Sequence, residues 1–411
     1  MTISFRSAAP LYAPSSARRI PALQGLRGAA FLGVLLFHTG VLSGGFLGVD
    51  LFFVLSGYLI TGLLLREASQ TGSVALIAFW GRRCRRLLPA LVLMLVVVTL
   101  VVCIIGAKDL LRTALGDGPW VQANLLNWHL LAESASYWDD FGDVRVFEHL
   151  WSIAVEEQFY LVWPLVVFVV ARWTRRPDAA VLVIAGAGAV ASVLAMALLT
   201  DPSDPTRAYT GTDTRAFALL LGAVAVTGPV RRRIGALADR MGNLGRDVTL
   251  VLLISVVVAS WLLVDGTDWT WLYPGGLLAH SAVAALLIAL LAQSGRRGPG
   301  RLLEFPPVQL IGDLSYSLYL WHWPVIVVLS WAVPRLDGWA LTLVTGAVSF
   351  VAALASRSVI EDRVRFRATW ARGRSGLLAL ILLMAALALF WVVVPQPAGP
   401  VIDVDQLGSA R

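Results

Sequence analysis

Apolar segments about as long as a membrane crossing recur along this chain, and they limit its fold more than any other feature. A helix needs about 20 apolar residues to cross the hydrocarbon core of a bilayer. Hydrophobic residues make up 58% of the 411-residue sequence, and charged residues only 14%. Eleven segments qualify, at approximately residues 21–42, 46–65, 87–107, 149–171, 179–200, 214–230, 248–264, 275–293, 315–333, 338–357 and 376–394. We therefore predict an all-α integral membrane protein, a polytopic bundle of about ten core helices with one additional C-terminal helix.

The basic residues predict how the chain is oriented. The formal net charge of +7 comes from arginine, because Lys108 is the only lysine. The arginines cluster in alternate loops, whereas the intervening loops are rich in Trp, Asp and Gly, a pattern typical of cytoplasmic and outer loops respectively. This distribution indicates membrane topology and argues against nucleic-acid binding. The arginine-rich loops are residues 6–19, 82–86, 172–176, 231–233, 296–301 and 363–374.

Four regions follow from this topology. We expect residues 1–20 to form a cytoplasmic tail, 21–365 the main membrane domain, 376–394 an additional helix and 395–411 an extracytoplasmic tail. The long outer segment 108–148 is expected to form an ordered cap at the membrane interface, because it is rich in aromatic residues. Cys84 and Cys103 support neither a disulfide framework nor a thiolate metal site. The cap candidates are Trp120, Trp128, His129, Trp138, Asp139, Asp140 and Asp143.

Two ionisable residues, Arg27 and His38, lie within the first apolar segment. An ionisable residue inside a span is costly and is by default a functional candidate. They are eleven residues apart, which on a helix returns to within about 20° of the same face and about 16 Å along the axis. We predict that both line one channel. The structural alternative is an arginine that reaches the interface and a histidine bonded to a backbone carbonyl.

Asp50 is the first candidate partner for His38. The turn at Ser43 to Gly45 folds the second span back, so both side chains are expected at similar depth. A carboxylate bonded to one imidazole nitrogen fixes the tautomer and raises the basicity of the other nitrogen, as a general base requires. The alternative is that Asp50 caps the start of the second helix.

The fourth span begins with a polar stripe. His149, Ser152 and Glu156 are spaced three and four residues apart and therefore share one face, and Tyr160 follows one turn later. Glu156 is a candidate for the catalytic set, and the other three are candidates for substrate contacts. Solvated glutamates at the membrane boundary are the alternative.

The ninth span has a similar concentration of hydroxyl groups and rings. Tyr316, Tyr319 and His322 are candidates for substrate contacts, and His322 is the second candidate for a titrating role. Hydrogen bonds between helices in lipid are the structural alternative.

Four arginines lie close together before the third span, which is more positive charge than a cytoplasmic loop needs to orient the chain. They are Arg82, Arg83, Arg85 and Arg86. Guanidinium groups bind phosphate oxygens in bidentate fashion, so this cluster is a candidate phosphate site, with contacts to anionic lipid as the alternative. The sequence has no Walker loop, no dinucleotide fingerprint, no HExxH and no GxSxG. These absences leave ATP-driven, metalloprotease and serine-hydrolase chemistry unsupported, and no metal is expected.

Taken together, these segments resemble the bacterial membrane O-acyltransferases of the acyltransferase-3 type, over about residues 20–365. The resemblance adds Asp213 and Arg215 as candidates for substrate binding. It also implies a place in the bacterial cytoplasmic membrane. The segments that carry it are Gly25 to Gly28 with His38, and then 48–57, 82–89, 151–160, 212–215, 315–324 and Glu361.

The resemblance implies that cytoplasmic acyl-CoA donates an acyl group, often acetyl, to a hydroxyl of a cell-envelope glycan or glycolipid. The arginine cluster would then hold the CoA phosphates, Arg27 would lie on the path of the acyl group, and His38, oriented by Asp50, would deprotonate the acceptor. Residues 376–411 resemble versions that continue into an extracytoplasmic SGNH-type esterase domain, so a domain or partner of that type is expected.

Two other classes of function stay open at this point. A permease or flippase for a surface-glycan precursor would use Arg27 and His38 as a substrate or proton path. A non-catalytic chain that anchors an esterase domain would need neither residue. Loss of acylation on substitution of His38 separates the first reading from the other two.

Overall fold

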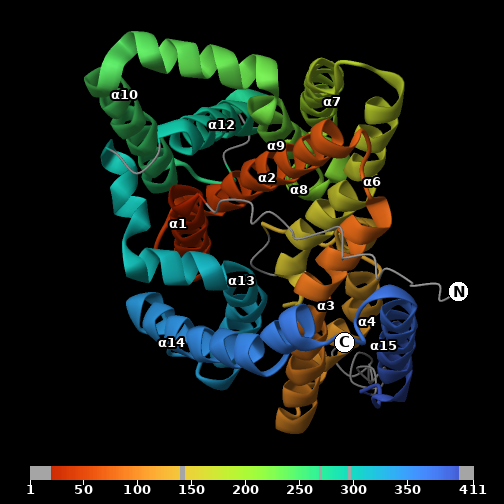
Figure 1. Ribbon diagram of the computed structural model, residues 1–411. Coiled ribbons are helices and arrows are strands. Elements are labelled where there is room, and N and C mark those ends of the chain that lie inside the picture. The colour runs from red at the N-terminus through yellow and green to blue at the C-terminus, as the bar shows by residue number, and fades with distance from the viewer. Residues whose placement is uncertain (1–19, 139–143, 268–270, 295–297, 398–411) are drawn as a thin grey trace, which may run out of the picture.

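The computed structural model describes residues 20–138, 144–267, 271–294 and 298–397, and within these residues every regular element is a helix (Figure 1). The α-helices are α1 Pro21–His38, α2 Gly48–Thr71, α3 Leu76–Ile105, α4 Lys108–Gln122, α5 Leu126–Ala132, α6 Trp151–Trp173, α7 Pro177–Leu199, α8 Thr206–Thr210, α9 Thr212–Val226, α10 Gly228–Leu263, α12 Leu277–Ser294, α13 Pro306–Ala332, α14 Gly338–Ser356 and α15 Gly373–Val393. The short 3₁₀ or π segments are η1 Ser43–Leu47, η2 Glu148–Leu150, η3 Leu272–Gly276, η4 Gly298–Glu304, η5 Arg357–Glu361 and η6 Arg363–Arg367.

The predicted all-α membrane fold is confirmed. Among the described residues, eight helices are long and apolar enough to cross a membrane by length and composition. The three other predicted spans form α1, α9 and α13, which carry the polar residues Arg27, Arg215 and His322. Most of the predicted tails 1–20 and 395–411, namely residues 1–19 and 398–411, lies outside the described residues. So do Asp139, Asp140, Asp143, Arg296 and Arg297.

Three helices extend well beyond the apolar segments that predicted them. Helix α3 begins at Leu76 and α13 at Pro306, so the arginine cluster of α3 is helical. Helix α10 begins at Gly228 and continues through a kink at Gly242, where φ is 65°. An apolar window ends at the first charges, but arginine is a good helix former and the helix continues through them.

The site is built where α1 and α2 meet α6 and α13. Figure 1 shows α1 and α2 in the middle of the bundle, with α10 and α12 on one side and α13 and α14 on the other. Helix α1 packs mainly on α13, and α2 mainly on α9. Small residues allow the second contact, because a methyl group at Gly57 would overlap the carbonyl of Leu219 and one at Gly222 would overlap that of Val54.

The outer segment 108–148 does not lie flat across the helix ends. The Gln122 side chain, at the end of α4, donates to the carbonyl of Met384 at 2.8 Å and accepts from Trp391 Nε1 at 2.9 Å. Met384 lies eleven residues after the start of α15, or about 16 Å along that helix. Helix α4 therefore ends level with the middle of α15, which corrects the prediction of an interfacial cap.

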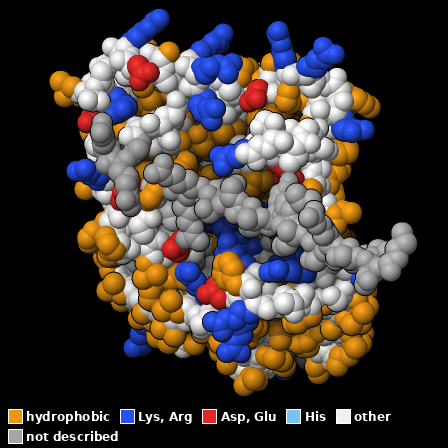
Figure 2. Space-filling view, viewed as in Figure 1, with side chains coloured by type: hydrophobic (Ala, Val, Ile, Leu, Met, Phe, Trp, Pro, Cys, Tyr) orange, Lys and Arg blue, Asp and Glu red, His pale blue; other side chains and the backbone are white. Residues whose placement is uncertain are grey.

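The outer flanks are apolar. Large hydrophobic side chains are exposed along α7 and α15, including Val183 at 68% and Leu382 at 59%. Figure 2 shows hydrophobic side chains over the flanks of one face, and Lys and Arg side chains along its upper edge and near its middle. A soluble monomer rarely exposes so much contiguous apolar surface, and contact with lipid explains it.

Candidate active site

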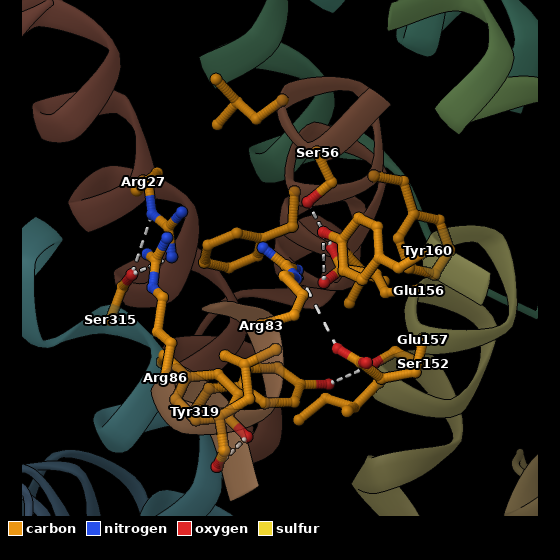
Figure 3. Close-up of a pocket in the computed structure, with 17 residues that line it drawn as sticks. Arg27, Ser56, Arg83, Arg86, Ser152, Glu156, Glu157, Tyr160, Ser315 and Tyr319 are labelled. Atoms are coloured by element: carbon orange, nitrogen blue, oxygen red, sulfur yellow. Dashed lines mark hydrogen bonds and ion pairs between the residues drawn. The ribbon is translucent and has the colours of Figure 1, made fainter. Parts of the chain in front are cut away.

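A polar pocket lies inside the bundle, between α1, α2, α3, α6 and α13. Its volume is about 70 Å³. Three arginines and two glutamates line it, which gives the lining a formal charge of +1. Figure 3 shows these side chains pointing toward one another. The polar lining residues are Arg27, Ser56, Arg83, Arg86, Ser152, Glu156, Glu157, Tyr160, Ser315, Tyr316 and Tyr319.

Arg27 is held in this pocket by α13. Its Nε and Nη2 both donate to Ser315 Oγ, at 3.2 and 3.1 Å. Figure 3 places Arg86 directly beside it. The guanidinium therefore points into the pocket. This argues against the alternative in which Arg27 reaches out to the membrane interface.

Glu156 lies on the opposite wall of the pocket. It accepts hydrogen bonds from Ser56 Oγ at 2.8 Å and from the Tyr160 hydroxyl at 3.2 Å. The Arg83 guanidinium stacks on the Tyr160 ring at 3.6 Å, and its Nη2 lies 3.9 Å from Glu157. Glu156 and Tyr160 are thus bonded to each other, and both glutamates line the pocket.

The predicted four-arginine cluster divides into two pairs. Arg83 and Arg86 line the pocket. Arg82 is exposed and lies 3.8 Å from Glu67, whereas Arg85 donates to the carbonyl of Ala371 at 3.1 Å. Residues three apart share a helix face, and the cluster is helical. The prediction that all four form one site is therefore wrong in its geometry.

His38 lies at the other end of α1, against a second histidine. Its Nδ1 is 2.9 Å from His322 Nε2, and its Nε2 is 3.2 Å from the Tyr137 hydroxyl. The Trp323 ring lies 4.7 Å from the His38 ring. The indole Nε1 of Trp323 donates to the carbonyl of Arg145 at 2.8 Å. His38 is therefore bonded to side chains on both nitrogens and not to a backbone carbonyl.

The direction of these hydrogen bonds follows from His322. Its Nδ1 is 2.7 Å from the carbonyl oxygen of Tyr319, and a carbonyl only accepts, so Nδ1 carries the proton. In a neutral ring Nε2 of His322 is then an acceptor, and it accepts from His38 Nδ1. This leaves Nε2 of His38 unprotonated, facing the Tyr137 hydroxyl. His38 thus has the tautomer that a general base needs.

Tyr319 joins the pocket to the histidines. Its hydroxyl lines the pocket, bonded to Ser152 Oγ at 2.6 Å and to the carbonyl of His149 at 3.0 Å, and its own carbonyl accepts from His322. The His149 ring lies 5.4 Å from that of His322. Both ring nitrogens of His149 are buried, with no hydrogen-bond partner among the described residues. Tyr319 therefore contacts the pocket through its side chain and His322 through its backbone carbonyl, and His322 in turn contacts His38.

Asp50 does not pair with His38, which corrects the prediction. Its Oδ1 lies 2.8 Å from Arg215 Nη2 and accepts from Ser281 Oγ at 3.2 Å. Both Asp50 and Arg215 are fully buried. The turn sets the depth of Asp50 but not the direction of its side chain, which points toward α9 and α12, whereas His38 faces α13. Asp50 and Arg215 form a buried ion pair of their own.

Of two further predicted residues, one lies outside the pocket and the other lines it. Asp213 is paired with Arg207, with distances of 2.9 and 2.7 Å, and lies outside the pocket. Tyr316 lines the pocket and donates to the carbonyl of Leu87 at 3.1 Å.

Besides Glu157, which also lines the pocket, sequence reasoning missed four uncharged residues of the site. For Ser56 and Ser315, polarity was the only feature that could have identified them. For Trp323, it was the number of aromatic residues around it in the sequence. Tyr137 lies in a segment that was noted for aromatic content alone. None of the four is ionisable at neutral pH, which is the property that drew attention to Arg27 and His38.

The fold and the site define a class: a polytopic helical membrane protein with a charged pocket inside the bundle and a hydrogen-bonded pair of histidines, His38 and His322, next to the pocket residue Tyr319. The chain belongs to the family whose model is described as an acyltransferase domain, which matches residues 20–360. Among the described residues, no three His, Cys, Asp or Glu side chains are arranged to hold a metal ion.

Several curated proteins are similar to the chain. Peptidoglycan O-acetyltransferase OatA of Listeria monocytogenes is 34% identical over 359 residues, which is 85% of this chain and 56% of that protein. Putative peptidoglycan O-acetyltransferase YrhL of Bacillus subtilis is 38% identical over 75% of this chain and 49% of its own length. O-acetyltransferase OatA of Staphylococcus aureus is 35% identical over 79% of this chain and 53% of its own length. The chain thus spans about half the length of these relatives, and no solved structure matches it.

Proposed function

We propose that this chain transfers an acyl group from cytoplasmic acyl-CoA to a hydroxyl of a cell-envelope glycan or glycolipid. The observation that carries the proposal is that Tyr319 contacts both a pocket with three arginines and His322, the hydrogen-bond partner of His38. The names of the relatives support acetyl as the group and peptidoglycan as the acceptor class. The comparisons give no support to a permease.

The donor would enter at the basic pocket. A volume of about 70 Å³ has room for only a few waters, so the pocket admits the reactive end of a donor and not its nucleotide. Arg83 and Arg86 would bind donor phosphates or the oxygens near them. Arg27 lies about 16 Å from His38 along α1, so the two residues do not contact the same carbonyl. Arg27 would bind the arm of the donor on its way to His38.

His38 would act as the general base. Its Nε2 removes the proton of the acceptor hydroxyl, the oxygen forms an ester bond with the acyl carbon, and the carbon–sulfur bond breaks. The thiolate of CoA then receives the proton from His38. The Tyr137 hydroxyl marks the position beside Nε2 where an acceptor hydroxyl would bind. Glu156 would keep the polar wall of the pocket in place through Ser56 and Tyr160.

The remaining sequence predictions are part of this proposal. The arginine-rich loops support a bacterial cytoplasmic membrane protein with its N-terminus inside and its C-terminus outside. His149, Ser152, Tyr316, Tyr319 and His322 would line the route of the acyl group. An SGNH-type domain or partner outside the membrane would accompany the chain.

The function is tested with labelled acetyl-CoA and membranes that contain the chain. We expect His38→Ala to abolish transfer of label to the glycan fraction, because Nε2 of His38 is the nitrogen that faces the Tyr137 hydroxyl, where the acceptor would bind. Leu32→Ala is the matched control, since Leu32 lies on the same helix and its side chain is exposed. Full transfer by His38→Ala would remove His38 from the mechanism.

The donor site is tested by two double variants of equal charge. We expect Arg83→Gln with Arg86→Gln to weaken acyl-CoA binding at least tenfold, since a hydrogen bond to a charged group contributes about 1.5–3 kcal/mol. Arg82→Gln with Arg85→Gln should leave binding within about twofold. Calorimetry in detergent measures both, and equal losses in the two double variants would contradict the assignment.

A further inference from the structure

A second cavity, of about 210 Å³, lies apart from the first and shares no lining residue with it. It is formed at the end of α2, together with the start of α7, the end of α9 and the start of α10. The lining residues are Gly62, Leu65, Arg66, Ser69, Asp178, Val226 and Arg231. Neither the acyl-transfer path nor the family comparison assigns a role to it.

Two cations converge on this cavity from different helices. Arg66, on α2, and Arg231, on α10, both line the cavity, and both residues are exposed to solvent. Neither guanidinium forms a hydrogen bond or an ion pair with a described residue. Two unpaired guanidiniums that face one cavity repel each other. An anion between them removes that repulsion.

The carboxylate in the cavity does not neutralise the two arginines. Asp178 Oδ1 accepts the backbone N–H of Gly228 at 2.9 Å, which ties α7 to the first turn of α10. No ion pair joins Asp178 to Arg66 or Arg231 among the described contacts. Two arginines and one aspartate leave the lining with a formal charge of +1.

The shape of the lining suits a phosphate group. Arg66 lines the cavity from α2, and the Ser69 hydroxyl donates to the carbonyl of Arg66 at 2.8 Å, so the two guanidiniums are the donors left for a ligand. Guanidinium forks bind phosphate oxygens in bidentate fashion. Leu65 and Val226 make another part of the wall apolar. We propose that this cavity binds a phosphate group, carried by an anionic phospholipid or by a water-soluble phosphate.

Thermal unfolding of the purified full chain in detergent tests this proposal, and it is independent of acyl transfer. One arm titrates inorganic phosphate against chloride at equal ionic strength. The other adds phosphatidylglycerol or phosphatidylcholine to the micelles. We expect phosphate or phosphatidylglycerol to raise the unfolding temperature of the wild-type chain, and the apparent affinity to fall about tenfold or more in Arg66→Gln and in Arg231→Gln.

Arg233→Gln is the matched control, because Arg233 is exposed near Arg231 and does not line the cavity. Arg66→Lys and Arg231→Lys keep the charge but lose the fork, and we expect them to bind with intermediate affinity. Stabilisation by phosphate that depends on both arginines identifies a soluble ligand, and stabilisation by phosphatidylglycerol alone identifies a lipid headgroup. No stabilisation in either arm, or an equal loss in Arg233→Gln, would overturn the proposal.

Discussion

Replacement of His322 tests the chain of hydrogen bonds that sets the tautomer of His38. His322→Ala removes the acceptor for His38 Nδ1, which lies 2.9 Å away, in a site where His322 is fully buried. A buried donor left without a partner costs about 1–3 kcal/mol. His38 avoids that cost by moving its proton to Nε2, which faces Tyr137, and in that tautomer Nε2 no longer accepts a proton.

The expected loss of rate follows from that energy. A bias of about 1–3 kcal/mol toward the wrong tautomer lowers the competent fraction about 5- to 150-fold. We expect kcat for transfer from labelled acetyl-CoA to fall by that factor, with acyl-CoA binding within about twofold of wild type. His322→Gln places an amide oxygen near the position of Nε2 and should recover part of the rate.

Leu310→Ala, on the exposed face of the same helix, is the control for general effects on α13. A rate for His322→Ala within twofold of wild type would refute the tautomer argument. A loss that appears only in donor binding would show that His322 contacts the donor and does not position His38.

Two predictions concern stability. Asp50→Ala leaves Arg215 buried without its partner, and we expect it to lower the free energy of unfolding by about 3–5 kcal/mol. The double variant Asp50→Ala with Arg215→Met should recover most of that loss in denaturant titrations. Equal stability of the single and double variants would contradict this prediction. Gln122→Ala removes two hydrogen bonds that hold α15 on α4. For a loss of about 1–3 kcal/mol, we expect proteolysis near α15 to be about 5-fold faster or more. Trp391→Phe should give a smaller effect, and unchanged cleavage in both variants would show that other contacts hold α15.

Helical periodicity and membrane physics predict the axis of the site. Both place Arg27 and His38 on one face of one span, and the structure brings the two residues to α13, where Ser315 and His322 bind them. The stripe on α6 is predicted for the same reason, and Ser152 and Glu156 line the pocket. These predictions depend only on the 3.6-residue repeat and on the cost of an ionisable group in lipid.

The partners of these residues are not predictable in the same way. Spacing from a turn gives the depth of Asp50, but the rotation of α2 decides whether it meets His38 or Arg215, and that rotation depends on contacts such as Gly57 with Leu219. The course of α4 is also beyond what the sequence predicts. Charged and polar residues interrupt this helix too often to mark it as a segment at membrane depth, and the Gln122 amide at its end is satisfied by α15.

The most direct test of the central claim is a structure of the chain with a non-hydrolysable acyl-CoA analogue. The account predicts donor oxygens on Arg83 and Arg86, the arm beside Arg27, and the acyl carbon next to Tyr319 and His322, within about 4 Å of the position of an acceptor bound to His38 Nε2. An acyl carbon that remains in the pocket beside Glu156, with His38 out of reach, would contradict it.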